Sequence, residues 1–181
     1  MRRLLPEQIE ELTSLYHKSY QSNEALGIHF KAARITSQEV ESAVESLPIF
    51  TSLEGDKIIS TLAVRLPWSE NPSPFALPHL GWIATDPDYQ GNNLAKGLIE
   101  EVVQNYIAKE LKAPAVTLGT AAEHPWLIRA YEKMGFSYFG ERRLFPDHKT
   151  VYMIKILNLT ALKRLKDSDL QDLLKENIYE F

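Results

Sequence analysis

The sequence predicts an α/β protein whose sheet has an antiparallel front and a parallel junction. Three observations predict this class. The chain opens with apolar residues at helical spacing, continues with two short apolar runs around a tight turn, and then alternates strand-like with helix-like segments. A strand, a long helix and another strand in succession form a crossover connection, which makes neighbouring strands parallel.

The composition bounds the function before any motif is considered. The 181 residues fit one globular domain, and the apolar share of 44% and charged share of 24% are ordinary for a folded protein. The formal net charge of −4 argues against a nucleic-acid partner and mildly favours an amine substrate. The lack of cysteine excludes disulfides, thiolate metal ligands and cysteine nucleophiles. Because no apolar run suits a signal peptide or a membrane span, we expect a cytoplasmic protein without a membrane partner.

Two helices and a hairpin are expected before the first proline-rich loop. An apolar stripe with acidic residues outside it predicts the first helix. Ser37 is a candidate N-cap for the second helix, which Pro48 ends. Glu54-Gly55-Asp56 is a hairpin turn signal. The expected elements are an edge strand over residues 1–5, a helix over 7–21, a loop or broken helix over 22–35, a helix over 37–47, and strands over 49–53 and 57–66.

Strands and helices alternate in the second half of the chain, which closes with a hairpin and a tail. Prolines mark residues 68–78 as a loop, Pro125 suits the first position of a short helix, and Gly135 suits its end. Spaced leucines in the charged tail predict a last helix. The expected elements are strands over 80–85, 115–120, 136–145 and 150–157, a long helix from Leu94 to the break at Ala113-Pro114, a helix over 125–134, a hairpin turn over 146–149, and a helical tail over 160–181.

The stretch Asp86-Pro87-Asp88-Tyr89-Gln90-Gly91-Asn92-Asn93-Leu94-Ala95 joins a buried strand to the long helix. The start of a helix presents unpaired N–H groups and the positive end of the helix dipole, so it is a natural anion site. In sheets of this kind, ligands lie beyond the carboxyl ends of diverging strands. This turn follows such an end and is therefore the first candidate binding site.

Two motifs resemble those of the GNAT superfamily of acyl-CoA N-acyltransferases. The family pattern at the turn is Arg or Gln, any two residues, Gly, any residue, then Gly or Ala. The chain has Gln90-Gly91-Asn92-Asn93-Leu94-Ala95, with Asn93 where the central Gly is usual. Asn tolerates positive φ best among non-glycine residues, and it can also cap a helix. One strand later, Ala130-Tyr131-Glu132-Lys133-Met134-Gly135-Phe136 is similar to the family's Tyr-Glu-Lys-x-Gly-Phe motif.

The resemblance covers residues 50–157 well and implies a GNAT-like fold. Such a fold has a central, mostly antiparallel sheet with a parallel splayed strand pair, flanked by helices. We expect one acyltransferase domain over residues 1–159, followed by a helical tail over 160–181 that packs on the domain or on a partner. The resemblance implies acetyl-CoA as cosubstrate. No metal is expected, because no metal-ligand spacing joins His17, His29, His124 and His148.

The resemblance assigns binding roles to particular residues. Backbone N–H groups of the turn would bind the CoA pyrophosphate, and Gly91 would let the backbone come close. The backbone of Ile83 and Thr85 would pair with the pantetheine arm like an added strand. His124 stands where members commonly carry Asn, and it would cap the next helix or touch pantetheine. The pyrophosphate residues would be Gln90, Gly91, Asn92, Asn93, Leu94 and Ala95.

Two side chains are the catalytic candidates. Tyr131 would protonate or hydrogen-bond the leaving thiolate, a general-acid role implied by the resemblance. The attacking amine must lose a proton, and many relatives use a carboxylate on the strand before the turn. This strand has no Asp or Glu before Asp86, so the candidates for the base are His79 and bulk water acting through a wire.

The expected function is N-acetyl transfer from acetyl-CoA to an amine of a small molecule or protein, by direct attack in a ternary complex. A non-catalytic acyl-CoA-binding or regulatory module is the alternative, motivated by the missing carboxylate and by Asn93. The acceptor would be chosen by residues 22–35, the 68–78 loop and the closing hairpin. The tail helix or a sheet edge could form a homodimer.

Overall fold

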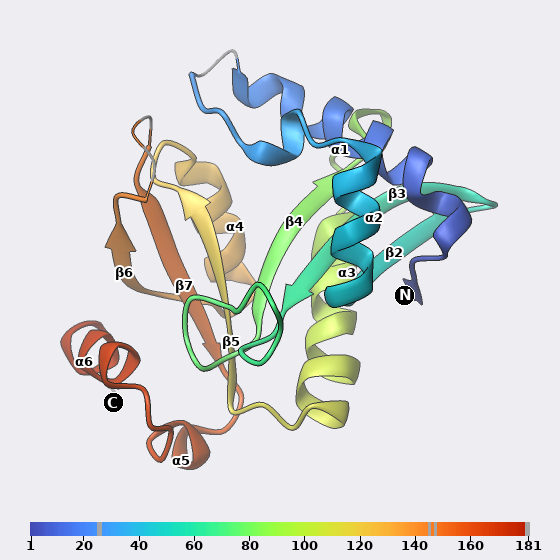
Figure 1. Ribbon diagram of the computed structural model, residues 1–181. Helices are drawn as coiled ribbons and strands as arrows, with labels where there is room; N and C mark the ends of the chain where they lie inside the picture. The colour runs from blue at the N-terminus through green and yellow to red at the C-terminus, as the bar shows by residue number, and fades with distance from the viewer. Residues whose placement is uncertain (25–26, 145, 147, 180–181) are drawn as a thin grey trace. The chain divides into compact units, whose positions relative to one another are not determined.

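The computed structural model describes residues 1–24, 27–144, 146 and 148–179. In this part of the chain, seven strands form one sheet in the order β1-β2-β3-β4-β5-β7-β6 (Figure 1). β4 and β5 are its parallel pair, and their pairing joins His79 to Thr117 and Leu80 to Leu118. The predicted class, a mostly antiparallel sheet with one parallel pair and flanking helices, is confirmed. The strands are β1 (Arg2–Arg3), β2 (Ile49–Glu54), β3 (Lys57–Arg65), β4 (His79–Thr85), β5 (Ala115–Ala121), β6 (Ser137–Arg142) and β7 (Thr150–Ile156).

The chain divides into two compact units, and β4 contributes to both. Unit 1 comprises Met1–Val64 and Gly81–Val102, and unit 2 comprises Arg65–Leu80 and Val103–Phe181. The α-helices are α1 (Ile9–Glu24), α2 (Ser37–Ser46), α3 (Leu94–Glu101), α4 (Pro125–Lys133), α5 (Leu159–Leu162) and α6 (Ser168–Asn177). Short 3₁₀ turns cover Pro6–Gln8, Lys31–Ala33 and Pro87–Tyr89, and a π-helical segment, η4, covers Val102–Glu110.

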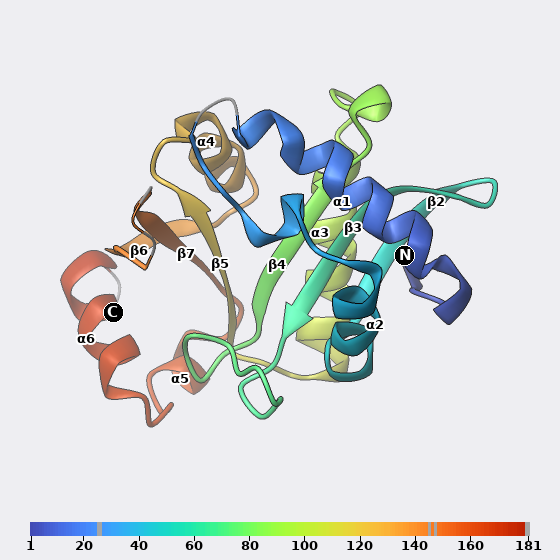
Figure 2. The ribbon, with the colours of Figure 1, turned by 45° about the horizontal axis from the view of Figure 1, so that its top comes forward.

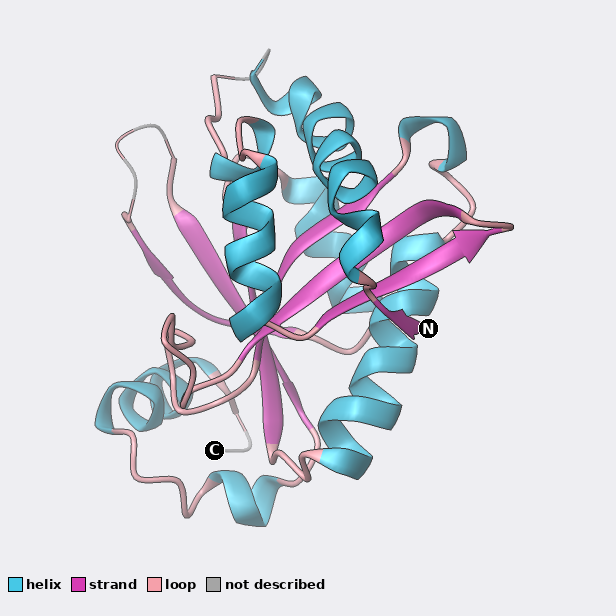
Figure 3. Cartoon of the chain, turned by 45° about the vertical axis from the view of Figure 1, so that its right-hand side comes forward, coloured by secondary structure: helices cyan, strands magenta, loops and turns pink. Residues whose placement is uncertain are grey.

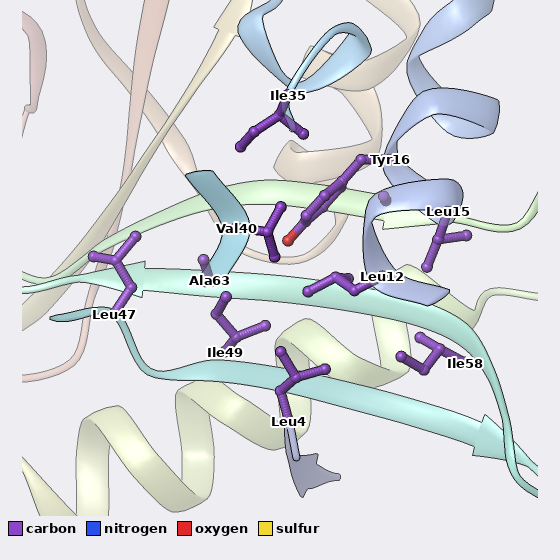
Figure 4. Close-up of a cluster of buried hydrophobic side chains, with 11 residues drawn as sticks. Leu4, Leu12, Leu15, Tyr16, Ile35, Val40, Leu47, Ile49, Ile58 and Ala63 are labelled. Carbon is purple, nitrogen blue, oxygen red and sulfur yellow. The ribbon is translucent and has the colours of Figure 1, made fainter. Parts of the chain in front are cut away.

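In unit 1, α1 and α2 cover one face of the β2–β3 hairpin and α3 covers the other (Figure 2). Leu12 and Tyr16 of α1 and Val40 of α2 are fully buried against the hairpin. Figure 4 shows side chains from both helices and both strands meeting in this core. Because the apolar residues of α1 recur at helical spacing, one face of that helix is buried from Leu12 to Tyr16, with Ile9 and Tyr20 half-buried at either end.

Thr36, and not Ser37, is the N-cap of α2. The Thr36 hydroxyl accepts from the Glu39 N–H at 3.2 Å, and the Glu39 carboxylate accepts from the Thr36 N–H at 3.0 Å. This reciprocal pair is a capping box. Thr36 and Ser37 are both residue types that cap helices. Glu39 lies three residues after Thr36, the spacing of a capping box, and this favours Thr36 as the N-cap.

In unit 2, β5, β7 and β6 form an antiparallel ladder covered by the C-terminal helices. α5 and α6 follow β7 as two short helices (Figure 3). Leu170 and Leu174 of α6 are fully buried in a cluster with Phe139 of β6 and Tyr152 of β7. The tail therefore packs on the strands of its own unit.

Several element bounds differ from those predicted. The strand expected over 136–145 is β6, which ends at Arg142. The long helix is α-helical only to Glu101 and then widens into η4. Parts of the segments predicted over 22–35, 136–145, 146–149 and 160–181 lie outside the described residues, at positions 25, 26, 145, 147, 180 and 181.

Candidate active site

The turn before α3 leaves the start of that helix without a protein cap. Gly91 has φ +85° and Asn93 has φ +57°, so both use the left-handed region. The Asn93 carbonyl accepts from the Gly97 N–H at 2.9 Å and begins the helix, but the Asn93 side chain makes no capping hydrogen bond. Asn93 thus adopts the positive φ that Asn tolerates, and its side chain does not cap the helix. The first N–H groups of α3 have no intrahelical acceptor and no capping side chain, which fits a pyrophosphate.

The other end of the turn is held by an ion pair in unit 1. The buried Asp86 carboxylate lies 2.8 Å from Lys57 Nζ and accepts from the Asp88 N–H at 3.0 Å. The hydrogen bond from Lys57 holds the pKa of Asp86 below its usual range. Tyr89 donates to Glu54 of the hairpin and lies under the Lys57 ammonium. These contacts anchor the turn to the β2–β3 hairpin.

The edge of β4 expected to meet pantetheine already has partners from α1. The Tyr20 hydroxyl donates to the Ile83 carbonyl at 2.9 Å, and the Ser19 hydroxyl donates to the Thr85 carbonyl at 2.7 Å. A carbonyl oxygen has two lone pairs, so each retains acceptor capacity. Because the Asp86 N–H donates to Ile59 of β3, the alternate residues Ile83 and Thr85 face away from that strand.

Trp82 interrupts the regular geometry of β4. Its φ is +48°, a strained conformation for a bulky residue. Its ring meets that of Tyr16 edge to face, with centroids 5.6 Å apart. Strain of this kind is held by surrounding packing and gathers at functional sites. The sequence carried no signal for it, because Trp is not a residue that favours positive φ.

Tyr131 combines a buried ring with an accessible hydroxyl. The residue lies on α4 and is 7% exposed, and its ring lies 6.2 Å from that of Phe136. Burial raises the pKa of Tyr131 to about 12. The hydroxyl bonds to none of the described residues, yet it is not among the enclosed polar atoms. It is therefore a protonated donor that reaches solvent.

His79 and His124, the two candidate histidines, are both buried. His79 Nδ1 lies 2.9 Å from Thr117 Oγ1, and burial, helped by the charge of Arg65, lowers the pKa of His79 to about 3. The His124 carbonyl accepts the first hydrogen bonds of α4, and the His124 ring makes no capping hydrogen bond. This ring is tilted by 43° to that of Trp126, with centroids 4.9 Å apart. Burial also lowers the pKa of His124.

The predicted site residues thus fall into two groups. The turn and the β4 edge with Ile83 and Thr85 belong to unit 1, whereas His79, His124 and Tyr131 belong to unit 2. No described contact joins His79 to Tyr131. Among the described residues, no set of three or more His, Asp or Glu side chains could hold a metal ion. None of the described helices is long and apolar enough to span a membrane.

The chain belongs to the acetyltransferase (GNAT) family, whose model matches residues 9–136. It is an acetyl-CoA-dependent N-acetyltransferase, and the family predicted from its two motifs is confirmed. It is 36% identical over 148 residues to the S-(2-succino)cysteine N-acetyltransferase of Bacillus subtilis (strain 168), covering 82% of this chain and 90% of that one. It is 33% identical over 142 residues to the S-alkylcysteine N-acetyltransferase of the same strain, covering 78% and 80%.

A solved structure supports the fold. The structure of yncA from Salmonella typhimurium with its cofactor acetyl-CoA matches with a TM-score of 0.67. The match covers 87% of this chain and 92% of that one at 13% identity. At this identity the likeness concerns the fold alone.

Proposed function

We propose that the chain acetylates the α-amino group of a small S-substituted cysteine, by direct attack on acetyl-CoA in a ternary complex in the cytoplasm. The identity of 36% and 33% to two enzymes named for such substrates supports the choice of acceptor. The uncapped start of α3, with Gly91 and Asn93 at positive φ, is the structural observation that carries acetyl-CoA binding. The absence of cysteine leaves no thiol to carry the acetyl group, which favours direct transfer.

The residues of unit 1 would bind the cosubstrate. Backbone N–H groups from Gln90 to Ala95 would bind its pyrophosphate through the helix start. The outward edge of Ile83 and Thr85 would pair with pantetheine through N–H groups and the unused carbonyl lone pairs. Acetyl-CoA supplies the acetyl group as a thioester.

Tyr131 would stabilise the departing thiolate by donating a hydrogen bond. Its pKa of about 12 lies above the ordinary thiol pKa of about 8.5. Full proton transfer from Tyr131 to the sulfur would then be uphill by about 5 kcal/mol. A donated hydrogen bond has no such cost, and it strengthens as negative charge develops on sulfur. Tyr131 therefore acts as a retained donor.

Water, rather than His79, would carry away the proton of the amine. A base whose conjugate acid has a pKa of about 3 holds an abstracted proton weakly, and an amino group is far more basic. His79 is neutral throughout the physiological range, because burial disfavours its charged form. A relay through solvent needs no titrating side chain.

The variant His79→Asn tests that assignment. Asn retains a polar atom near Thr117 Oγ1, so we expect kcat/KM to fall less than about ten-fold. The profile of rate against pH between 5 and 9 should keep its shape, since His79 does not titrate there. A loss of about a hundred-fold or more, together with a missing acidic limb in the profile, would make His79 the base instead.

Binding of the cosubstrate is tested by thermal unfolding. At a hundred times its Kd, acetyl-CoA should stabilise the folded chain by about 2.7 kcal/mol. For a chain of this size that raises Tm by roughly 5–10 °C. An unchanged Tm at millimolar acetyl-CoA would contradict the proposal. CoA without the acetyl group is the matched control, because it shares the pyrophosphate and should also raise Tm.

A further inference from the structure

Unit 2 gathers two arginines, a phenol and two further rings that the transfer chemistry leaves unused. We call Arg65, Phe75, His79, Arg142 and Tyr152 the Tyr152 cluster. The ring of Tyr152 lies 5.2 Å from that of Phe75 and 6.2 Å from that of His79. The guanidinium carbon of Arg142 lies 5.6 Å from the centroid of Phe75. The end of β3, its following loop, β4, β6 and β7 each supply one member.

Arg65 is a partly buried cation held by neutral oxygens. Its Nη2 donates to Asn71 Oδ1 at 2.7 Å and to the Pro72 carbonyl at 2.6 Å, and its Nε contacts the Asn71 carbonyl at 3.4 Å. A guanidinium has five N–H donors, and those on Nη1 find no acceptor among the described residues. No described carboxylate pairs with Arg65, and burial lowers its pKa. An incoming anion would supply the missing charge.

The hydroxyl of Tyr152 is a second available donor. It bonds to no described residue and is not among the enclosed polar atoms, so it reaches solvent. Burial raises the pKa of Tyr152, and the charges of Arg142 and Arg65 oppose that rise. Because the overall shift of the pKa is upward, the Tyr152 hydroxyl keeps its proton at neutral pH and can donate a hydrogen bond. It lies in the field of two cations, where an anion is favoured.

An exposed glycine on β5 lies next to Tyr152 and His79. A Cβ added at Gly119 of β5 would lie 3.1 Å from Thr150 Cγ2, 3.7 Å from Tyr152 Cε1 and 3.8 Å from His79 Cε1. Gly119 itself is exposed. A side chain there would crowd Thr150 first and would also contact Tyr152 and His79. Gly119 therefore lies directly against Thr150, Tyr152 and His79, and its lack of a side chain lets these residues keep their packing.

The C-terminal tail holds the loop that carries Phe75 and the partners of Arg65. Asp167 accepts from the Ala76 N–H at 2.8 Å, and Asp169 pairs with Arg142 at 3.1 Å. Phe75 packs in the same apolar cluster as the leucines of α6. The tail thus fixes the loop and one arginine of the cluster.

We propose that Arg65, Arg142 and the Tyr152 hydroxyl bind a carboxylate of the acceptor, so that the enzyme selects amino acids over amines that lack an acid group. The inference rests on the proposed function, because the acceptor must be an amine. Arg65 is the specificity residue, since it alone of the two arginines lacks an acidic partner among the described residues. Arg142 adds charge and Tyr152 adds a donor. The overall charge of −4 would otherwise repel an anionic acceptor.

Steady-state kinetics with three acceptors test this site. The acceptors are S-(2-succino)cysteine, S-methylcysteine and S-methylcysteine amide. The enzymes are the wild type, Arg65→Gln, Arg65→Lys, Tyr152→Phe and the control Arg164→Gln, which removes an exposed tail charge. We expect Arg65→Gln to lower kcat/KM for S-(2-succino)cysteine about 10- to 100-fold through KM, with KM for acetyl-CoA unchanged. Arg65→Lys should lose less, and Arg164→Gln should lose nothing.

The three acceptors distinguish binding of the α-carboxylate from binding of the side-chain carboxylates. If the cluster binds the α-carboxylate, S-methylcysteine suffers the same loss in Arg65→Gln, and its amide is a poor acceptor of the wild type. If it binds the side-chain carboxylates, only S-(2-succino)cysteine is affected. If Arg65→Gln changes kcat/KM by the same factor for all three acceptors, the proposed carboxylate site is wrong. A Tm equal to that of the wild type excludes misfolding of each variant. Tyr152→Phe is a second test of the site, because it removes a hydrogen-bond donor and no charge.

Calorimetric titration of S-(2-succino)cysteine in the presence of CoA distinguishes this inference from the proposed function. Binding that requires Arg65, in a protein that acetylates no amine, would retain the carboxylate site and reject the function. Acetylation of all three acceptors without discrimination would retain the function and reject the site.

Discussion

Replacing Tyr131 with phenylalanine should lower kcat by about a hundred-fold or more while leaving KM for acetyl-CoA nearly unchanged. The substitution keeps the buried ring and its contact with Phe136, and it removes only the hydroxyl. A donor that acts mainly as charge develops contributes to kcat rather than to ground-state binding. General acid and hydrogen-bond donors of this kind typically contribute 10²- to 10⁴-fold. Stopped-flow and steady-state measurements of thiol release check the value.

Two controls make the Tyr131 result specific. Tyr138→Phe removes the hydroxyl of a tyrosine that is 40% exposed on β6, and it should leave kcat unchanged. A solvent-viscosity series shows whether chemistry or product release limits turnover. Equal kcat in Tyr131→Phe and wild type, with chemistry rate-limiting, would remove the role assigned to this hydroxyl.

The second large effect is expected at the turn before α3. Gly91→Ala should raise the Kd for acetyl-CoA about ten-fold or more. At φ +85° an alanine is strained by roughly 1–2 kcal/mol, although a Cβ there meets no atom within 4 Å. The strain is relieved by moving the backbone, which displaces the N–H groups aimed at the pyrophosphate. Isothermal titration with acetyl-CoA measures the change.

The matched control for this turn is Gly97→Ala. Gly97 lies on α3, has no positive φ, and a Cβ there also meets nothing within 4 Å. Alanine should stabilise the helix by roughly 0.5–1 kcal/mol and leave Kd unchanged. Asn93→Gly should likewise bind acetyl-CoA at least as tightly as wild type. If Gly91→Ala and Gly97→Ala bind equally well, the turn does not hold the pyrophosphate as proposed.

Local sequence signals predicted the parts of the fold that local physics decides. Asn93 was expected to tolerate a positive φ, and it adopts one because the turn needs a left-handed residue before the helix. The apolar stripe of α1 and the hairpin around Gly55 likewise follow from spacing and turn chemistry. The capping box of α2 was missed, although Glu39 three residues after Thr36 carried the signal.

The rest depends on contacts between residues that are far apart in sequence. Packing on Tyr16 holds Trp82 at its strained positive φ, and no sequence pattern in β4 predicts that conformation. His79 looked like a base because histidine ordinarily titrates near neutral pH, but burial next to Thr117 moves its pKa to about 3. Arg65 and Tyr152 come together only through the strand order and the loop, so neither was a candidate.

A transfer assay with purified protein, acetyl-CoA and S-(2-succino)cysteine tests the proposed function most directly. Mass spectrometry of the acceptor and titration of the released thiol follow the two products. We expect N-acetyl product and free CoA in equal amounts, at a rate that falls about a hundred-fold in Tyr131→Phe. Saturable acetyl-CoA binding without acetylation of S-(2-succino)cysteine or S-methylcysteine would contradict the proposed function.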